Sequence, residues 1–158
     1  FVDFGNAYHL LQSTYLVAPG AKPAKIEDVN ESGVRVGGVA NTATLRAAQR
    51  TAPKATFVTV PGVDVAVAVA AIKAGEIDCI ALSRESLSGV TAKIPGSRVL
   101  DGGLLNSSTA VAVPKGKMEA LAYVSHFIED AKASGLVRKA FDDMDLKNLQ
   151  VAPAGMKP

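Results

Sequence analysis

The sequence predicts an α/β protein: a three-layer fold with a largely parallel open sheet flanked by helices. Two observations predict this fold. Between residues 35 and 100, short β-branched segments alternate with longer helical segments, and such alternation is typical of βαβ units. Gly or Pro closes most of these segments, for example at Pro61-Gly62 and Pro95-Gly96, which limits each one to a single strand or helix.

Composition excludes several classes of protein. The chain has 158 residues, enough for one domain or for one lobe plus part of another. Its net charge is +2 without a cluster of Lys or Arg, which argues against a nucleic-acid surface. The single cysteine, Cys79, excludes an internal disulfide and a thiolate metal cluster. No apolar run is long enough to span a bilayer. The chain begins with Phe1, from which we expect a processed chain or a fragment.

The clearest strand, loop and helix lie in residues 33–50. The strand is indicated by an apolar run with three valines: Val34, Val36 and Val39. Gly37 and Gly38 allow a tight turn or a close backbone approach, and Asn41 and Thr42 are good helix N-cap residues. A helix N-terminus carries unpaired N–H groups and the positive end of the helix dipole, so this one favours a carboxylate, phosphate or sulfate. An ordinary capped turn is the alternative interpretation.

The elements before this segment are weaker predictions. Residues 1–8 mix aromatic and polar types and are expected to form a loop or a strand end. Residues 15–18 are expected to form a strand that stops at Pro19, and residues 25–29 one helical turn.

After residue 50, strands and helices continue to alternate. Strands are expected at residues 56–60, 78–83, 97–100 and 108–113. Helices are expected at residues 63–74, 84–93, 117–134 and 136–144. The segment 63–74 is ambiguous, because its valines favour a strand whereas its Ala content and the following Gly75 favour a buried helix. Residues 151–158 contain two prolines and are expected to be loosely ordered.

In open α/β sheets, ligands bind beyond the carboxyl ends of the strands, near helix N-termini. The order of the elements therefore points to three loops, at residues 38–44, 60–64 and 82–86.

The order of the segments resembles the second half of the bacterial extracellular solute-binding proteins of family 3. These proteins have the type 2 periplasmic-binding-protein fold and capture amino acids and similar solutes for ABC importers. Five phrases carry the resemblance: FVDFGNAYHLLQSTYLVAPG, IEDVNESGVRVGGVANTATLRAAQ, VDVAVAVAAIKAGEIDCIAL, STAVAVPKG and EALAYVSHFIEDAKASGLVRKAFDDMDL. The resemblance implies one complete α/β lobe at residues 17–108. Residues 1–16 and 109–158 would then supply crossing strands, a remnant of the first lobe and its C-terminal helices, and the first part of that lobe, which would precede Phe1, is missing.

The resemblance also implies ligand contacts. We expect seven ligand-binding residues: Asn41, Thr42, Ala43, Thr44, Ser83, Arg84 and Tyr8. Thr42 matches the hydroxyl residue that contacts a ligand carboxylate, and Asn41 stands where the family has Gly. Ser83 stands where amino-acid binders usually have an Asp for the ligand amine, and Arg84 beside it favours an anion. A solvated residue at the start of a helix is the alternative interpretation of Arg84. Tyr8 lies near the first crossing; a partly packed surface aromatic is the alternative.

Three functions remain open at this stage. The first is the binding component of an ABC importer, in the periplasm or outside the cell. It would capture a small polar or anionic solute by hinge closure near residues 15–18 and 109–113, and its partners would be the permease subunits. The second is a dehydratase of the cyclohexadienyl or arogenate type, for which only Asp64 and Glu85 offer an acid or base. The third is a ligand-sensing module. No catalytic residue, cofactor, metal or nucleic acid is expected.

The missing first part of the lobe would expose apolar helix faces. The residues concerned are Leu121, Val124, Ile128, Val137 and Phe141. From this exposure we expect a dimer or a larger assembly. His9 and His126 are not expected to form a metal-ligand pair with a carboxylate, and they predict no metal site.

Overall fold

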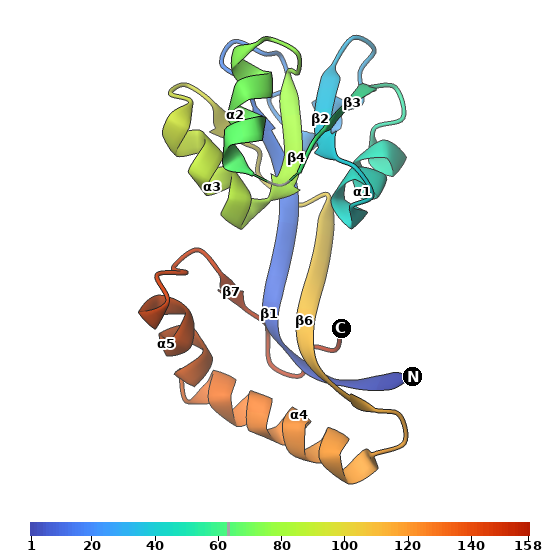
Figure 1. Ribbon diagram of the computed structural model, residues 1–158, viewed down its shortest axis with the longest axis vertical. Helices are drawn as coiled ribbons and strands as arrows, with labels where there is room; N and C mark the ends of the chain where they lie inside the picture. The colour runs from blue at the N-terminus through green and yellow to red at the C-terminus, as the bar shows by residue number, and fades with distance from the viewer. Residues whose placement is uncertain (63) are drawn as a thin grey trace. The chain divides into compact units, whose positions relative to one another are not determined.

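The computed structural model describes residues 1–62 and 64–158 (Figure 1). The elements are β1 (Val2–Val17), η1 (Ile26–Val29, a 3₁₀ turn), β2 (Arg35–Val39), α1 (Ala43–Thr51), β3 (Thr56–Val60), α2 (Val65–Lys73), β4 (Cys79–Ser83), α3 (Arg84–Lys93), β5 (Arg98–Val99), β6 (Leu105–Pro114), α4 (Met118–Ala133), α5 (Leu136–Asp143) and β7 (Gln150–Val151). The chain divides into two compact units: the sheet unit, Gln12–Leu105, and the helical unit, Phe1–Leu11 with Asn106–Pro158.

The sheet unit contains strands in the order β3-β2-β4-β1-β5. β2 pairs in parallel with β3 and β4, whereas β1 pairs antiparallel with both β4 and β5. β5 therefore runs in the same direction as β4, and β1 alone runs against the others. The predicted open α/β sheet, largely parallel, is confirmed. The helical crossovers α1 and α2 explain it, because strands joined by such crossovers pair in parallel.

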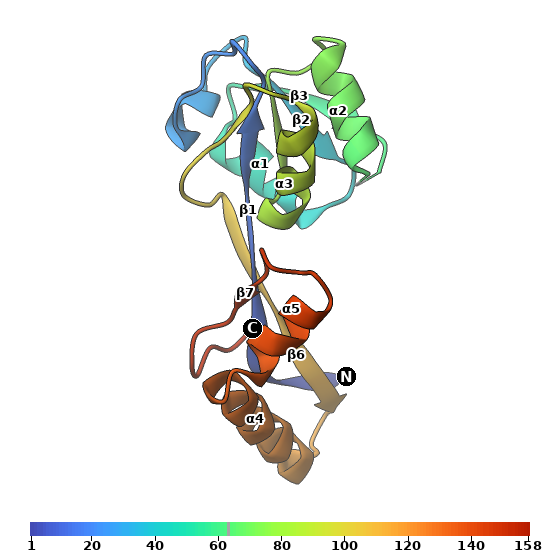
Figure 2. The same cartoon turned by 90° about the vertical axis from the view of Figure 1, so that its left-hand side faces the viewer.

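Two apolar cores lie on opposite faces of this sheet, so the three-layer prediction is also confirmed. Successive strand residues point to opposite faces: Ile80 and Leu82 pack with α2 and α3, whereas Cys79 and Ala81 pack with α1 and η1. In Figure 2 the short turn η1, in light blue, lies on the other side of the sheet from α2.

The ambiguous segment at residues 63–74 forms the helix α2, preceded by Asp64 and followed by Gly75 with a positive φ of 68°. Alternating Val and Ala supply a helix that is apolar nearly all round, and burial against β3 and α3 favours the helix over the strand that the valines alone prefer. Residue 63 itself lies outside the described residues.

Gly37 and Gly38 lie inside β2, where they allow a close approach rather than a turn. A Cβ atom on Gly38 would lie 2.6 Å from Cδ1 of Leu45 in α1, and one on Gly37 would lie 2.6 Å from Cδ1 of Ile77. Helix α1 packs closely against β2 because Gly38 has no side chain.

The helical unit corrects two predictions. Residues 1–8 were expected to form a loop or a strand end, but they belong to the long strand β1, which begins at Val2 and pairs with β6 and β7. The tail was expected to be loosely ordered, but its backbone is hydrogen-bonded on both sides of Pro153: Ala152 N–H donates to the Tyr8 carbonyl at 3.0 Å and Ala7 N–H to the Met156 carbonyl at 2.8 Å. Composition could not reveal these long-range backbone bonds, which outweigh the effect of the prolines.

Candidate functional site

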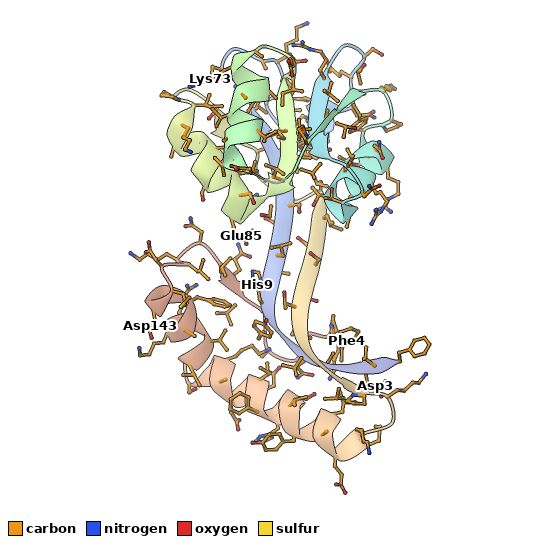
Figure 3. The ribbon with its side chains drawn as sticks, in the orientation of Figure 1. Asp3, Phe4, His9, Lys73, Glu85 and Asp143 are labelled. Carbon is orange, nitrogen blue, oxygen red and sulfur yellow. The ribbon has the colours of Figure 1, made fainter. Side chains whose placement is uncertain are left out.

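The N-termini of α1 and α3 lie at the same edge of the sheet. β2 and β4 are neighbours in parallel register, with Gly38 opposite Ala81, and each leads directly into its helix. Figure 3 labels Glu85 in the first turn of α3, at the opposite end of the sheet unit from Lys73 in α2. This edge is the carboxyl end of the parallel strands, where α/β sheets bind ligands.

Thr42 caps α1 and leaves two backbone amides uncommitted. Its Oγ1 accepts a hydrogen bond from Leu45 N–H at 3.2 Å and donates one to the Val39 carbonyl at 2.8 Å. The N–H groups of Ala43 and Thr44 have no acceptor among the described residues. The first turn of α1 carries no acidic residue, so the positive end of the helix dipole is not neutralised locally. The capping prediction for Thr42 is confirmed, and these amides suit an anionic group.

Asn41 lies in the left-handed region with φ 62° and is exposed. Asn is one of the few residues other than Gly that adopts this conformation at low cost. It therefore turns the chain into α1 at low conformational cost although it is not a Gly. Its carbonyl accepts a hydrogen bond from Nη1 of Arg46 at 3.1 Å.

Ser83 caps α3, and a buried serine links it to α1. Oγ of Ser83 accepts from Ser86 N–H at 3.3 Å. Across the sheet, Ser83 pairs with Ser13 of β1. The Ser13 side chain is fully buried, and its Oγ lies 3.0 Å from Oγ1 of Thr44. Three small hydroxyl residues thus bring β1, α1 and α3 together.

Arg84 is largely committed to the protein itself. Its Nε donates to Oε1 of Gln12 at 2.5 Å, and its Nη2 donates to the carbonyls of Leu100 and Gly102 at 3.2 and 2.5 Å. The Nη1 group has no acceptor among the described residues. The sequence left two interpretations of Arg84 open, a group facing a ligand and a solvated residue at the helix start, and neither anticipated these contacts.

The sequence prediction also missed Gln12 and Ser13. The available signal was the polar run Gln12-Ser13-Thr14 between the apolar pair Leu10-Leu11 and the segment Tyr15-Leu16-Val17. A polar residue buried in a strand needs a partner, which for Thr14 is the Leu100 carbonyl at 3.1 Å.

Tyr8 lies in the helical unit and lines an apolar hollow there of about 240 Å³. Phe127 of α4 and Leu136 and Phe141 of α5 form other parts of its wall. The structure therefore does not place Tyr8 with the residues of the sheet unit, and the packed aromatic is the interpretation that its surroundings favour.

The remaining predicted loop, residues 60–64, includes residue 63 and is therefore described only in part. Asp64 caps α2, and its Oδ1 accepts from Ala66 N–H at 2.8 Å. This carboxylate is therefore used for capping.

A second hollow, of about 320 Å³, lies in the sheet unit. It is found at the amino end of β2 and is lined by Lys22, Glu31 and Asp78. Arg35 binds both carboxylate oxygens of Asp78, with Nε at 3.0 Å from Oδ2 and Nη2 at 2.7 Å from Oδ1. These bonds lower the pKa of Asp78. Because that carboxylate is already paired and the hollow lies at the wrong end of the strands, we place the candidate site at α1 and α3.

Comparison with solved structures identifies the architecture. The ancestral amino acid-binding protein AncCDT-1, a precursor of cyclohexadienyl dehydratase, superposes on 90% of this chain with a TM-score of 0.67 and 26% identity. The chain has the fold of a periplasmic-binding-protein lobe. A putative ABC transporter binding component from Wolinella succinogenes, complexed with lysine, matches 90% of the chain with a TM-score of 0.70 and 19% identity. The protein AbpA from Streptococcus pneumoniae, bound to L-arginine, matches 90% with a TM-score of 0.67 and 20% identity.

The chain spans only 60–62% of the length of these three proteins. No family model and no curated protein matches it. Within the described residues, no group of three or more His, Cys, Asp and Glu side chains is placed to bind a metal ion, and no helix has the length and apolar character that crossing a bilayer requires.

Proposed function

We propose that the chain belongs to the substrate-binding component of an ABC importer and captures a small polar or anionic solute. One observation carries the proposal: the N-termini of α1 and α3 open at the same sheet edge, with the amides of Ala43 and Thr44 uncommitted. The fold shared with binding proteins for arginine and lysine supports it. Such a component works in the periplasm or outside the cell, closes about a hinge and delivers its ligand to permease subunits. It is not an enzyme.

The charges at the site favour an anionic group facing the sheet unit. The amides of Ala43 and Thr44 and the Nη1 group of Arg84 are donors, and Ser83 cannot neutralise an ammonium group. An organic acid, or the carboxylate end of an amino acid, fits these donors. We propose Asn41, Thr42, Ala43, Thr44, Ser83 and Arg84 as the contacts from this unit, whereas Tyr8 would contribute only from the helical unit.

A thermal-shift screen tests the proposal. The probes are the common amino acids, dicarboxylates and inorganic phosphate, each at a concentration up to a hundredfold above an expected Kd. A ligand at that excess stabilises the folded chain by about 2.7 kcal/mol, which is a readily measured rise in Tm. A rise in Tm with carboxylates that is absent with the corresponding amides supports an anion site. If no probe raises the Tm, the proposal is contradicted.

A dehydratase is the second candidate, because AncCDT-1 is described as a precursor of such an enzyme. Asp64 is used to cap α2, so an acid or base from the sheet unit would have to be Glu85 in the first turn of α3. Turnover of prephenate or arogenate that is lost in Glu85→Gln would favour the enzyme over the binding protein.

We propose further that the isolated chain associates with a second copy through the helical unit. The five residues expected to be exposed are not: Ile128 is buried, and Leu121, Val124, Val137 and Phe141 are half-buried. Ten other large apolar residues are exposed among the described residues, and all ten lie in that unit: Phe1, Val2, Phe4, Val111, Met118, Tyr123, Phe127, Leu136, Met144 and Leu146. The acidic residues of α5 are paired within the helix, Asp142 with Arg138 and Asp143 with Lys139. A partner therefore needs apolar surface rather than charge, and a second copy supplies it.

A further inference from the structure

Arg84 joins three separate segments of the sheet unit. It begins α3 at the candidate site, its Nε reaches Gln12 at the start of the unit, and its Nη2 reaches the carbonyls of Leu100 and Gly102 near the end of the unit. A planar guanidinium can donate to several acceptors in fixed directions at once, which a lysine cannot do.

Two of these segments, at Gln12 and at residues 100–102, lie at or near the places where the chain passes between the two units. The first passage lies between Leu11 and Gln12, and the second between Leu105 and Asn106. Further bonds join the two segments directly: Leu104 N–H donates to the Ser13 carbonyl at 2.9 Å, and Leu100 N–H donates to the Tyr15 carbonyl at 2.9 Å.

Packing reinforces this arrangement at Gly103. A Cβ atom there would lie 2.8 Å from Cγ and Nε2 of Gln12, so the glycine lets the second segment lie directly against the side chain that Arg84 binds. Gln12 therefore packs directly against Gly103. Arg84 also links Gln12 to the same segment by hydrogen bonds to the carbonyls of Leu100 and Gly102.

We propose that Arg84 is a positioning residue that clamps both chain passages at the edge of the sheet unit. Bending between the units then takes place before Gln12 and after Leu105. This moves the first hinge away from residues 15–18, because Tyr15, Leu16 and Val17 are fully buried and paired with β4. Because Arg84 also starts α3 directly after Ser83, the clamp connects the proposed ligand site with the hinge. That connection rests on the proposed function, whereas the clamp itself does not.

Hydrogen exchange of the ligand-free protein tests the clamp. In Arg84→Gln, we expect the amide of Leu104 to exchange about tenfold faster or more, while the amides of β2 keep their wild-type rates, because only local opening is affected. Arg84→Lys keeps the charge but cannot reach three acceptors, so it should also accelerate exchange. If Arg84→Gln does not fold, Gln12→Met removes one acceptor with little change in volume and should give the same local effect.

Arg98→Gln is the matched control. Arg98 also donates to two carbonyls of the sheet unit, those of Ala21 and Pro23, but these lie on a different loop. We expect faster exchange around Ala21 in this variant and no change at Leu104. Equal acceleration at Leu104 in both variants would show a general loss of stability rather than a clamp.

A distance measurement tests the effect on the hinge. Spin labels are placed through Lys73→Cys in α2 and Glu119→Cys in α4, two exposed positions in different units. Native Cys79 does not compete, because burial raises its thiol pKa to about 12. The distribution of label distances should be broader in Arg84→Gln than in the wild type. If the distance distribution and the exchange rate at Leu104 are both unchanged in Arg84→Gln, the clamp is wrong even if a ligand is found. If no probe in the ligand screen raises the Tm, the proposed function fails but the clamp can still be tested.

Discussion

Gly38 shows how one missing side chain positions the candidate site. Leu45, which occupies the space that a Cβ atom at Gly38 would take, belongs to the first turn of α1. The same turn presents the amides of Ala43 and Thr44. The position of the proposed donors therefore depends on a contact between the backbone of β2 and the helix. A Cβ atom at position 38 must displace the Leu45 side chain or the helix that carries it.

We predict that Gly38→Ala lowers stability by about 1–3 kcal/mol, the usual cost of overpacking a core, and weakens binding of any ligand found in the screen. Gly37→Ala is the control, because its Cβ meets Ile77, which precedes β4 and lies away from α1. It should cost similar stability and leave affinity near the wild-type value. Chemical denaturation and titration of the ligand measure the two effects. Equal loss of affinity in both variants would argue against α1 as the ligand-binding element.

Substitutions of Thr42 test the role of the N-terminus of α1. Thr42→Ala removes the acceptor for Leu45 N–H and should cost about 1 kcal/mol of unfolding free energy. Thr42→Ser keeps the hydroxyl and should stay close to the wild type. If Thr42 also contacts the ligand, affinity follows the same order in a calorimetric titration. A ligand that binds Thr42→Ala as tightly as the wild type would exclude this hydroxyl from the site.

At the scale of elements, Lys132 and Glu129 join three parts of the helical unit. Nζ of Lys132 lies 2.7 Å from Oε1 of Glu129 and donates to the carbonyls of Ala7 in β1 and Pro153 in the tail. Glu129 also accepts from Asn6 Nδ2 at 2.7 Å and from Gly155 N–H at 3.1 Å. One charged pair therefore joins α4 to both β1 and the tail, in addition to the backbone bonds between β1 and the tail.

This pair makes a pH-dependent contribution to stability. The bonds from Lys132 and then Asn6 lower the pKa of Glu129 from 4.5 to about 2. A carboxyl whose pKa is lower in the folded state stabilises it above the unfolded pKa, and that stabilisation is lost as pH falls through the folded pKa. We predict that Glu129→Gln melts at a lower temperature than the wild type at pH 7 and that the difference shrinks between about pH 4.5 and pH 2. Thermal melts across this range measure it.

Asp143→Asn is the control for that prediction. Its partner Lys139 lies at 2.6 Å on the surface of α5, and both side chains are mainly exposed. Exposed pairs of this kind contribute about 0.5 kcal/mol or less, so Asp143→Asn should leave the melting curve nearly unchanged. A difference for Glu129→Gln that stays constant from pH 7 to pH 2 would mean that its charge is not responsible.

Local sequence pattern was sufficient to predict most elements of the sheet unit and the sheet edge at which we propose the site. Thr42 could be predicted as a cap because capping depends on neighbours in sequence. The hydrogen bonds of Arg84 within the protein could not be predicted, because its acceptors lie 16, 18 and 72 residues away along the chain. The order of the tail was missed for the same reason, since its bonds to β1 join the two ends of the chain.

At the scale of the whole molecule, the two units differ in how they are stabilised. The sheet unit buries apolar side chains on both faces of its sheet. In the helical unit, α4 buries only Ile128 and Ala131, and α5 buries no residue. Burial of apolar surface is the main favourable contribution to folding. The proposed association with a second copy would bury apolar surface of the helical unit and leave the sheet unit unchanged.

We predict that the chain forms dimers or larger assemblies, which multi-angle light scattering over a range of concentrations will measure. Phe127 is 52% exposed and lines the apolar hollow of about 240 Å³, and Tyr123 on the same helix is 72% exposed. Phe127→Ser and Tyr123→Ser should shift the equilibrium toward monomer, because each removes apolar surface that association would bury. Thr59→Ala in the sheet unit is the control and should leave the equilibrium unchanged. A wild-type chain that remains monomeric at high concentration would show that the helical unit tolerates this exposure without a second copy.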